Sequence, residues 1–325
     1  MLETWFNQSW YGRIPWTWLL LPFMWVYAAV VKRKRHAYEA NSGTSAIPTI
    51  VVGNITVGGT GKTPVVQSLV RFLQDKGYKV GVISRGYGGS QTQHPHLITA
   101  SDSASQVGDE PYMLWQSLRV PVVIDPVRVR GIALLCEHEV DVVISDDGLQ
   151  HYAMPRDLEV CVLDGNRMLG NGRMLPVGPL REPVSRLGQV DYILIGGQQG
   201  FQGFMIQPLH WQNLVTGQKV ALDQLQIDKD CTAIAGIGNP EKFFTTIQEL
   251  GIKCGHKAFV DHYAYTREDA QKLSQQILMT EKDAAKIRPF AHGNMWSLSI
   301  EAKLHEEFYD RLEQDVRAMI NMRNN

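Results

Sequence analysis

The sequence predicts an α/β protein in which helices flank a mainly parallel sheet, with an apolar helix before it and a second, smaller α/β domain after it. Short continuous apolar runs alternate with helical patterns from about residue 47 onward, which is typical of a parallel sheet covered on both faces. An uncharged segment, 14–31, precedes a basic cluster, and a glycine-rich turn at 56–63 joins an apolar run to an amphipathic helix.

The N-terminal segment, 1–40, has the composition of a membrane-associated helix. No charged residue occurs between Arg13 and Lys32, and the sequence KRKR follows at 32–35. A spanning helix needs about 20 apolar residues, and this run is short for that and contains two prolines. Its Trp and Tyr residues favour the headgroup zone, and the basic cluster favours anionic lipid at the cytoplasmic side. We expect this helix to lie in the inner leaflet; a buried core helix is the alternative.

The glycine-rich turn follows the P-loop pattern G-x-x-x-x-G-K-[ST], except that Thr56 stands at the first glycine. Small residues let backbone N–H groups surround phosphate, and the start of the following helix adds a positive end. Lys62 is expected to reach the terminal phosphates of ATP, and the Thr63 hydroxyl to bind Mg²⁺. A tight strand-to-helix turn is the alternative. The expected nucleotide-binding residues are Thr56, Val57, Gly58, Gly59, Thr60, Gly61, Lys62 and Thr63.

Two pairs of adjacent carboxylates stand at the ends of predicted elements. The apolar run 140–145 ends in Asp146 and Asp147, which has the form of a Walker B strand, so one of the two is expected to hold Mg²⁺. Asp109 and Glu110 precede a helical pattern, where Asp109 is either a functional acid or only a helix cap.

The second half of the chain carries further candidates. In Asp261-His262 the carboxylate can poise the imidazole for proton transfer, although an ordinary surface histidine is the alternative. Arg181 lies in a Gly/Pro-rich loop and is either a phosphate-facing cation or solvated. The sequence TEKD at 280–283 lacks the spacing of the guanine-reading N-K-x-D motif, so GTP is not inferred.

These features divide the chain into four parts. After the N-terminal segment, residues 41–200 are expected to form a P-loop NTPase-like kinase domain and 201–222 a two-stranded hinge hairpin. Residues 223–325 are expected to form the smaller C-terminal domain. With a net charge of −1, no nucleic-acid surface is implied. The four cysteines form no C-x-x-C pair, so neither a zinc site nor a disulfide framework is expected.

Taken together, the motifs resemble the tetraacyldisaccharide 4'-kinase family, the lipid A 4'-kinases of Gram-negative bacteria. The motifs that carry the resemblance are the apolar N-terminal helix, GNITVGGTGKTP at 53–64, SRGYGG at 84–89, VGDEP at 107–111, ISDDGLQH at 144–151, GPLREP at 178–183, AGIGNPEKFF at 235–244, FVDHYAY at 259–265 and MTEKDAAK at 279–286. Their order and combination are far more specific than any one of them apart from the P-loop.

The resemblance implies transfer of the γ-phosphate of MgATP to the 4'-hydroxyl of tetraacyldisaccharide 1-phosphate. It implies a peripheral or monotopic enzyme at the cytoplasmic face of the bacterial inner membrane, with no obligate protein partner. It also implies two α/β/α domains joined by a two-stranded hinge. By residue matching, Asp109 and His262 act in catalysis with Lys62. Arg181 faces phosphate, and Glu110, Asp146, Asp147 and Glu182 organise Mg²⁺ or phosphate.

Two other functions share part of this pattern. A membrane-associated P-loop switch or assembly NTPase would use the same loop and Asp-ended strand, but would need neither the apolar anchor nor the Asp-His domain. A non-catalytic membrane scaffold with a relic nucleotide fold would not require an intact Lys62, Thr63 and Asp146.

Overall fold

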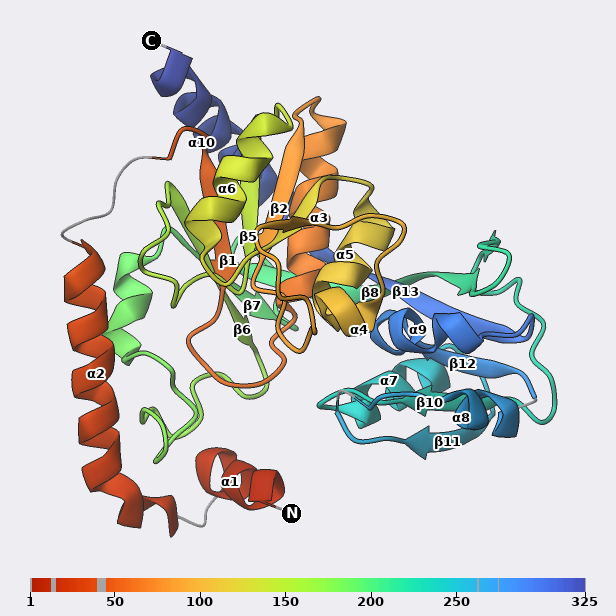
Figure 1. Ribbon diagram of the computed structural model, residues 1–325. Coiled ribbons are helices and arrows are strands. Elements are labelled where there is room, and N and C mark those ends of the chain that lie inside the picture. The colour runs from red at the N-terminus through yellow and green to blue at the C-terminus, as the bar shows by residue number, and fades with distance from the viewer. Residues whose placement is uncertain (1, 13–15, 40–44, 262, 274, 325) are drawn as a thin grey trace.

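The computed structural model describes residues 2–12, 16–39, 45–261, 263–273 and 275–324 (Figure 1). The predicted site residue His262 therefore lies outside the described residues. The described strands form one 13-stranded sheet in the order β11-β10-β12-β13-β8-β7-β6-β1-β5-β2-β4-β3, with β9 beside β8. Helices cover this mostly parallel sheet, so the predicted fold class is confirmed.

The first part of the sheet is the parallel core of the P-loop unit. Its strands are β1 (Thr49–Gly53), β2 (Val80–Ser84), β4 (Val122–Ile124), β5 (Val142–Asp146), β6 (Leu158–Asp164) and β7 (Tyr192–Gly196), with β3 (His96–Leu97) antiparallel at the edge. The helices are α3 (Lys62–Asp75), α4 (Ala104–Val107), α5 (Asp109–Leu118) and α6 (Arg128–Glu137), with the 3-10 helix η2 (Val184–Gln189). Since β1, β2, β5 and β6 run parallel, their carboxyl ends lie at one edge, where P-loop and Asp146 meet.

Alternation along β1 shows how the two helical layers are packed. Ile50 and Val52 face the apolar side of α3, whereas Val51 between them packs in a second cluster with Ile132 of α6. All three β1 side chains are completely buried. A strand points successive side chains to opposite faces, so a continuous apolar run is what a doubly covered strand requires.

Two long antiparallel strands, β8 (Gly203–Asn213) and β13 (Met295–Leu304), connect the two units of the molecule. β8 starts parallel to β7 of the P-loop unit, and β13 lies parallel to β12 (Ile277–Thr280) of the C-terminal unit. Within the predicted hinge, β8 also pairs with the short β9 (Lys219–Val220). The long partner of β8 therefore comes from outside the range 201–222, and the domain boundaries stay a prediction.

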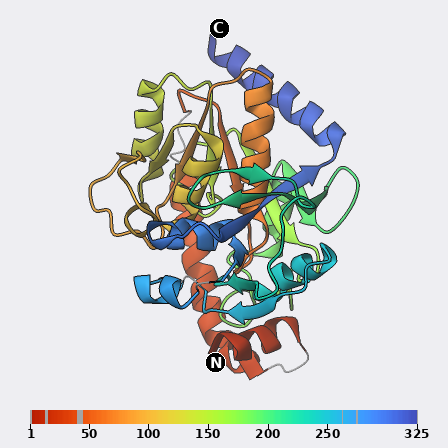
Figure 2. The ribbon, with the colours of Figure 1, turned by 90° about the vertical axis from the view of Figure 1, so that its right-hand side faces the viewer.

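The C-terminal unit is a small parallel sheet with helices. It contains β10 (Thr232–Ala235), β11 (Gly255–Ala258), β12, α7 (Pro240–Glu249), α8 (Arg267–Lys272), α9 (Glu281–Ile287) and η3 (Arg288–Phe290). The last helix, α10 (Glu306–Asn324), returns to the P-loop unit, as the two views show (Figures 1 and 2). There Phe308, Leu312 and Val316 are completely buried in the same core cluster as α3.

The N-terminal segment forms α1 (Leu2–Tyr11), the 3-10 helix η1 (Trp16–Leu20) and α2 (Leu21–Glu39), and α2 runs along one side of the P-loop unit (Figure 1). One side of α2 packs on the core through Met24, and the Tyr27 hydroxyl donates to the Arg181 carbonyl at 3.1 Å. Phe23 and Trp25, on the two flanks of this packed side, are about two-thirds exposed, at 65% and 67%. The helix therefore combines core packing with an exposed aromatic surface.

By length and hydropathy, no single helix in the described part of the chain suffices to cross a bilayer. The bent pair Trp5–Tyr11 and Trp16–Tyr38, with 96° between its two parts, meets the length and composition criteria only when both parts are taken together.

Candidate active site

The P-loop backbone has the shape that phosphate binding needs. Gly58 and Gly61 take positive φ angles of 96° and 90°, in the left-handed region that favours glycine. Gly61 is also the N-cap of α3 and supplies no side-chain acceptor, so the first-turn N–H groups of the helix point at the loop. A Cβ at Gly61 would lie 3.1 Å from the Phe204 ring of β8, so the connecting strand packs directly on this turn. The loop is therefore a built anion site.

The threonine at the first P-loop position is accommodated by a neighbouring segment. Thr56 is buried and forms a β-bridge with Leu180. On either side of it, Val57 N donates to Pro179 O at 2.9 Å and Arg181 N donates to Ile55 O at 2.7 Å. Thr56 has no positive φ, so its position does not demand glycine. The segment GPLREP at 178–183 thus fixes the first residues of the P-loop through backbone hydrogen bonds.

Three of the predicted residues meet at the carboxyl end of β5. Lys62 Nζ lies 3.6 Å from Asp147 Oδ1, and Arg181 Nη1 lies 3.1 Å from Asp147 Oδ2. Burial raises the pKa of Asp147, but the charges of Lys62 and Arg181 outweigh it, so the pKa lies below its usual value. Asp147 is therefore an ionised carboxylate held between two cations, one of which, Lys62, belongs to the P-loop.

Asp146 has the opposite environment from its neighbour. It is buried, and its Oδ1 atom has no hydrogen-bond partner among the described residues. Burial, and then the nearby charges of Glu110 and Asp147, raise the pKa of Asp146 to about 7. Buried polar atoms normally have a partner, and a hard cation such as Mg²⁺ is the partner that a carboxylate oxygen prefers. The site therefore fits a metal ion beside the phosphate loop.

Glu182, another carboxylate predicted to organise Mg²⁺, already has protein partners. Within the described ranges, no group of three or more His, Cys, Asp or Glu side chains is arranged to hold a metal ion. Glu182 is completely buried; its Oε2 lies 3.3 Å from Arg186 Nε, and its Oε1 accepts from Gln150 at 2.8 Å. Since Mg²⁺ keeps several waters and takes oxygens from phosphate, one or two protein ligands suffice.

Arg128, at the start of α6, belongs to no recognisable motif, and the sequence did not predict it as a site residue. Its Nη1 donates to Ser145 Oγ at 2.6 Å and its Nη2 to the Asp147 carbonyl at 3.0 Å. Burial lowers the pKa of Arg128 to about 10, which still leaves it charged at neutral pH. A Cβ at Gly148 would lie 2.8 Å from Arg128 Nη1, so glycine is required for this close approach. Arg128 thereby fixes the turn that carries the two aspartates, with Asp147 in the left-handed region at φ 48°.

The turn also contains a histidine that should make stability acid-sensitive. Burial, followed by the charges of Arg128 and Arg156, lowers the pKa of His151 from 6.5 to about 4. The unfolded chain then binds a proton between these two values and the folded one does not, so the free energy of unfolding decreases as pH falls below 6.5. Because the ring is partly exposed and its charge is screened by solvent, we expect a loss of about 1 kcal/mol between pH 7.5 and 5 from this group. Urea unfolding at the two pH values should show that His151→Gln removes this part of the decrease.

The matched control is His138→Gln, which changes an exposed histidine of the same unit. It should leave the pH dependence as in the wild type. An equal pH dependence in wild type and His151→Gln would contradict the assignment.

The two halves of the predicted acid–base pair come from different units. Asp109 is the first residue of α5, and Gly108 takes the N-cap position. The alternative that Asp109 is only a helix cap is therefore wrong. Lys282 Nζ lies 3.6 Å from Glu110 Oε1 and 3.7 Å from Asp261 Oδ1. The structure thus brings the 109–110 turn and the residue before His262 to the same cation.

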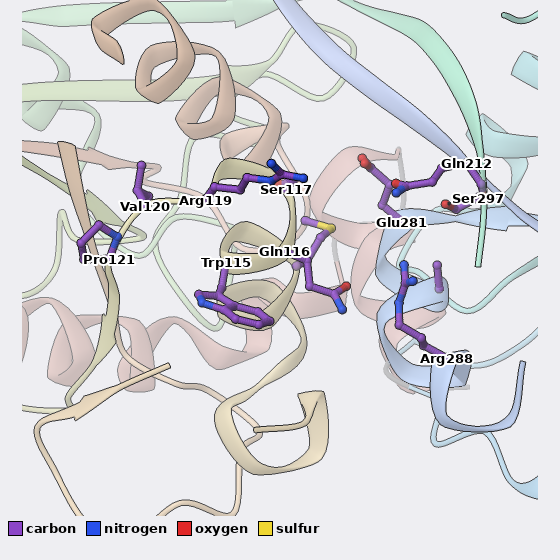
Figure 3. A pocket seen from close by; sticks show the side chains of 12 residues that line it. Trp115, Gln116, Ser117, Arg119, Val120, Pro121, Gln212, Glu281, Arg288 and Ser297 are labelled. Atoms are coloured by element: carbon purple, nitrogen blue, oxygen red, sulfur yellow. Dashed lines mark hydrogen bonds between the residues drawn. The ribbon is translucent and has the colours of Figure 1, made fainter. Parts of the chain in front are cut away.

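A separate cavity of about 560 Å³ lies between α5 and the strands that connect the units (Figure 3). One wall carries Trp115 and Arg119, and the other carries Gln212, Glu281 and Ser297. None of the predicted site residues lines it, so it is distinct from the phosphate loop.

Comparison with known proteins decides the family. The profile described as LpxK, tetraacyldisaccharide-1-P 4'-kinase, matches residues 16–317. This chain belongs to the tetraacyldisaccharide 4'-kinase family. A relative of that name from Legionella pneumophila (strain Corby) is 42% identical over 308 residues, covering 94% of this chain and 95% of its own length.

Two further members of the tetraacyldisaccharide 4'-kinase family are similar over almost their whole length. The Vibrio cholerae protein (classical Ogawa strain) is 41% identical, with 97% of each chain covered, and the Ectopseudomonas mendocina protein is 43% identical, covering 96% of this chain and 97% of its own. A solved structure, the "apo" form of LpxK from Aquifex aeolicus in complex with ATP, has a TM-score of 0.78 and 28% identity. It covers 94% of this chain and 99% of that chain. The family resemblance seen in the motifs is thus confirmed.

Proposed function

We propose that this chain transfers the γ-phosphate of ATP to the 4'-hydroxyl of tetraacyldisaccharide 1-phosphate, in lipid A biosynthesis. The observation that carries the proposal is that Lys62 of the phosphate loop and Arg181 both contact Asp147, in a chain whose family match spans 16–317. A switch NTPase shares the loop but gives no reason for that family match.

The proposed nucleotide site uses the loop backbone and two cations. The N–H groups of residues 57–63 bind the β- and γ-phosphates, Lys62 offsets their charge, and Arg181 faces the transferred group. Thr63 and Asp146 are the side chains that would hold Mg²⁺, which supplies further positive charge at the phosphates. Asp147, held by both cations, keeps them oriented until nucleotide binds.

The proposed acid–base pair is Asp109 and His262. A sugar hydroxyl is a weak nucleophile, so a base must accept its proton as the bond to phosphorus forms. Asp109, at the start of α5, accepts that proton, and His262 orients the carboxylate from the C-terminal unit. Because the pair is divided between two units, turnover requires that they approach each other, and that requirement limits futile ATP hydrolysis.

We further propose that the enzyme is peripheral or monotopic at the cytoplasmic face of the inner membrane. The exposed aromatic side chains of α2 would enter the lipid, and the basic cluster 32–35 would contact anionic headgroups. The acyl chains of the substrate would then stay in the bilayer during the reaction.

Replacing Phe23 and Trp25 together by serine should weaken binding to anionic vesicles by about tenfold or more, because two large apolar side chains no longer enter the lipid. Activity on detergent-dispersed substrate should remain. Met322→Ser is the control, since Met322 is 76% exposed but lies on α10. Unchanged vesicle sedimentation of the double variant would contradict the proposed orientation.

The reaction itself is tested by incubating the protein with Mg²⁺, ATP and tetraacyldisaccharide 1-phosphate, and measuring phosphate in the lipid. Stoichiometric ADP and bis-phosphorylated lipid support the kinase. ADP and free phosphate, with the lipid unchanged, would instead support a switch or assembly NTPase.

A further inference from the structure

The TEKD sequence at 280–283, which nucleotide binding does not explain, lies at the start of α9 where the two units touch. We propose that Lys282 is a positioning residue for phosphoryl transfer: it ties the loop before His262 to the 109–110 turn and so sets the approach of the two halves of the site. This inference rests on the proposed kinase function, because it concerns the alignment of that reaction.

The first turn of α9 is fixed firmly within the C-terminal unit. Thr280 Oγ1 accepts from Asp283 N at 3.2 Å and donates to Asp283 Oδ2 at 2.7 Å, which caps the helix. Asp283 is completely buried, and it also accepts from Gly236 N at 3.0 Å and from the Tyr265 hydroxyl at 3.1 Å. The helix start therefore moves together with the 236 turn and the 265 segment that flank the Asp261 loop.

Lys282 extends from this anchored turn to the other unit. Its ammonium group lies within 4 Å of Glu110, at 3.6 Å, and of Asp261, at 3.7 Å. The Lys282 side chain is 18% exposed, and the two carboxylates are 42% and 38% exposed. Ion pairs as exposed as these contribute little to folding stability, so the contacts are better suited to positioning than to holding the fold together.

The neighbouring residue shows that α9 contacts both the hinge and the interface. Glu281 lines the cavity between the units together with Gln212 of β8 and Ser297 of β13 (Figure 3). Consecutive side chains of one helical turn thus contact the connecting strands and the 109–110 turn. A change of angle between the units must therefore move Lys282 relative to Glu110.

The charge of Lys282 is needed where acidic groups converge. Without the ammonium group, Glu110 and Asp261 would lie near each other as like charges, and repulsion would move the segment that contains Asp261 away from the 109–110 turn. A lysine side chain is long and flexible and ends in a compact charge. Its ammonium group can therefore stay in contact with both carboxylates when the two units move slightly closer together. Arginine should reproduce this function in large part, whereas methionine keeps the length of the side chain without its charge.

The test compares Lys282→Met, Lys282→Arg and the control Lys272→Met in the full chain. Lys272 is 73% exposed and forms an ion pair with Glu268 at 3.8 Å on α8, so the control removes the same charge from the same unit. We expect Lys282→Met to lower kcat on the lipid about tenfold, with Kd for ATP and Tm close to wild type. Lys282→Arg should recover most of kcat, and Lys272→Met should match the wild type.

A double-mutant cycle with Asp261→Asn adds a readout that a purely structural role would not move. If Lys282 acts through Asp261, the double variant should lose little more kcat than the worse single variant. A Lys282→Met kcat within twofold of the control, an arginine variant as impaired as the methionine variant, or additive losses in the cycle would each overturn the inference. A wild-type protein that leaves the lipid unphosphorylated would instead refute the proposed function.

Discussion

Replacing Lys62 by alanine is expected to lower the rate of phosphoryl transfer to the lipid by about 10²–10³-fold. Lys62 is the first residue of α3, directly after the P-loop glycines, and its ammonium group lies 3.6 Å from Asp147 Oδ1. When ATP binds, it is the cation nearest the terminal phosphates in the proposed site. Its loss removes charge stabilisation where negative charge develops, and weakens nucleotide binding as well.

Two quantities are measured. Kd for ATP comes from a titration with a fluorescently labelled nucleotide, and kcat comes from the steady-state rate of lipid phosphorylation. Lys76→Ala is the matched control, because Lys76 stands at the other end of α3 and its side chain is 40% exposed. The control should lose little activity. A Lys62→Ala protein with wild-type Kd and kcat would remove the P-loop from the mechanism.

Replacing Asp109 by alanine is expected to lower kcat on the lipid by about 10²-fold or more, with Kd for ATP nearly unchanged. The reason is that the base acts on the sugar hydroxyl and not on the nucleotide. Asp109→Asn, which keeps the size of the side chain but cannot accept the proton in the same way, should be impaired to a similar degree.

Asp75→Asn, an exposed carboxylate change at the end of α3, is the control for loss of one negative charge in the same unit. Should Asp109→Ala turn over lipid at a near-normal rate, another group must accept the proton. A parallel loss of ATP affinity would place Asp109 in nucleotide binding.

Sequence patterns sufficed for the parts of the site that are local in the chain. The P-loop and the Asp-ended strand β5 both depend on residues within a single strand and the turn or helix that follows it. Short-range stereochemistry decides such features, so spacing alone is informative.

Local sequence patterns did not predict the contacts between segments that are distant in the chain. Arg128 reaches the Asp146–Asp147 turn only because α6 packs on β4 and β2, and nothing adjacent to it in sequence marks that position. Phe204 touches Gly61 across more than a hundred residues of chain. Such contacts follow from the packing of the whole sheet and not from local periodicity.

The arrangement of the connecting strands depended on pairing between distant parts of the chain. Residues 201–222 were expected to form a hairpin, and β8 and β9 do pair within that range. However, β13 is contributed by residues 295–304 and forms the long ladder with β8, and α10 then returns to the first core. Strand register and partner choice depend on which faces are buried, which one sequence leaves open.

The central claim is that phosphate moves from ATP to the 4'-hydroxyl of the lipid, and ³¹P NMR of the purified lipid product tests it most directly. The account predicts one new phosphomonoester resonance, coupled to the proton on the 4' carbon, in addition to the original 1-phosphate. A pyrophosphate signal at the 1-position, or unchanged lipid beside ADP and inorganic phosphate, would contradict it.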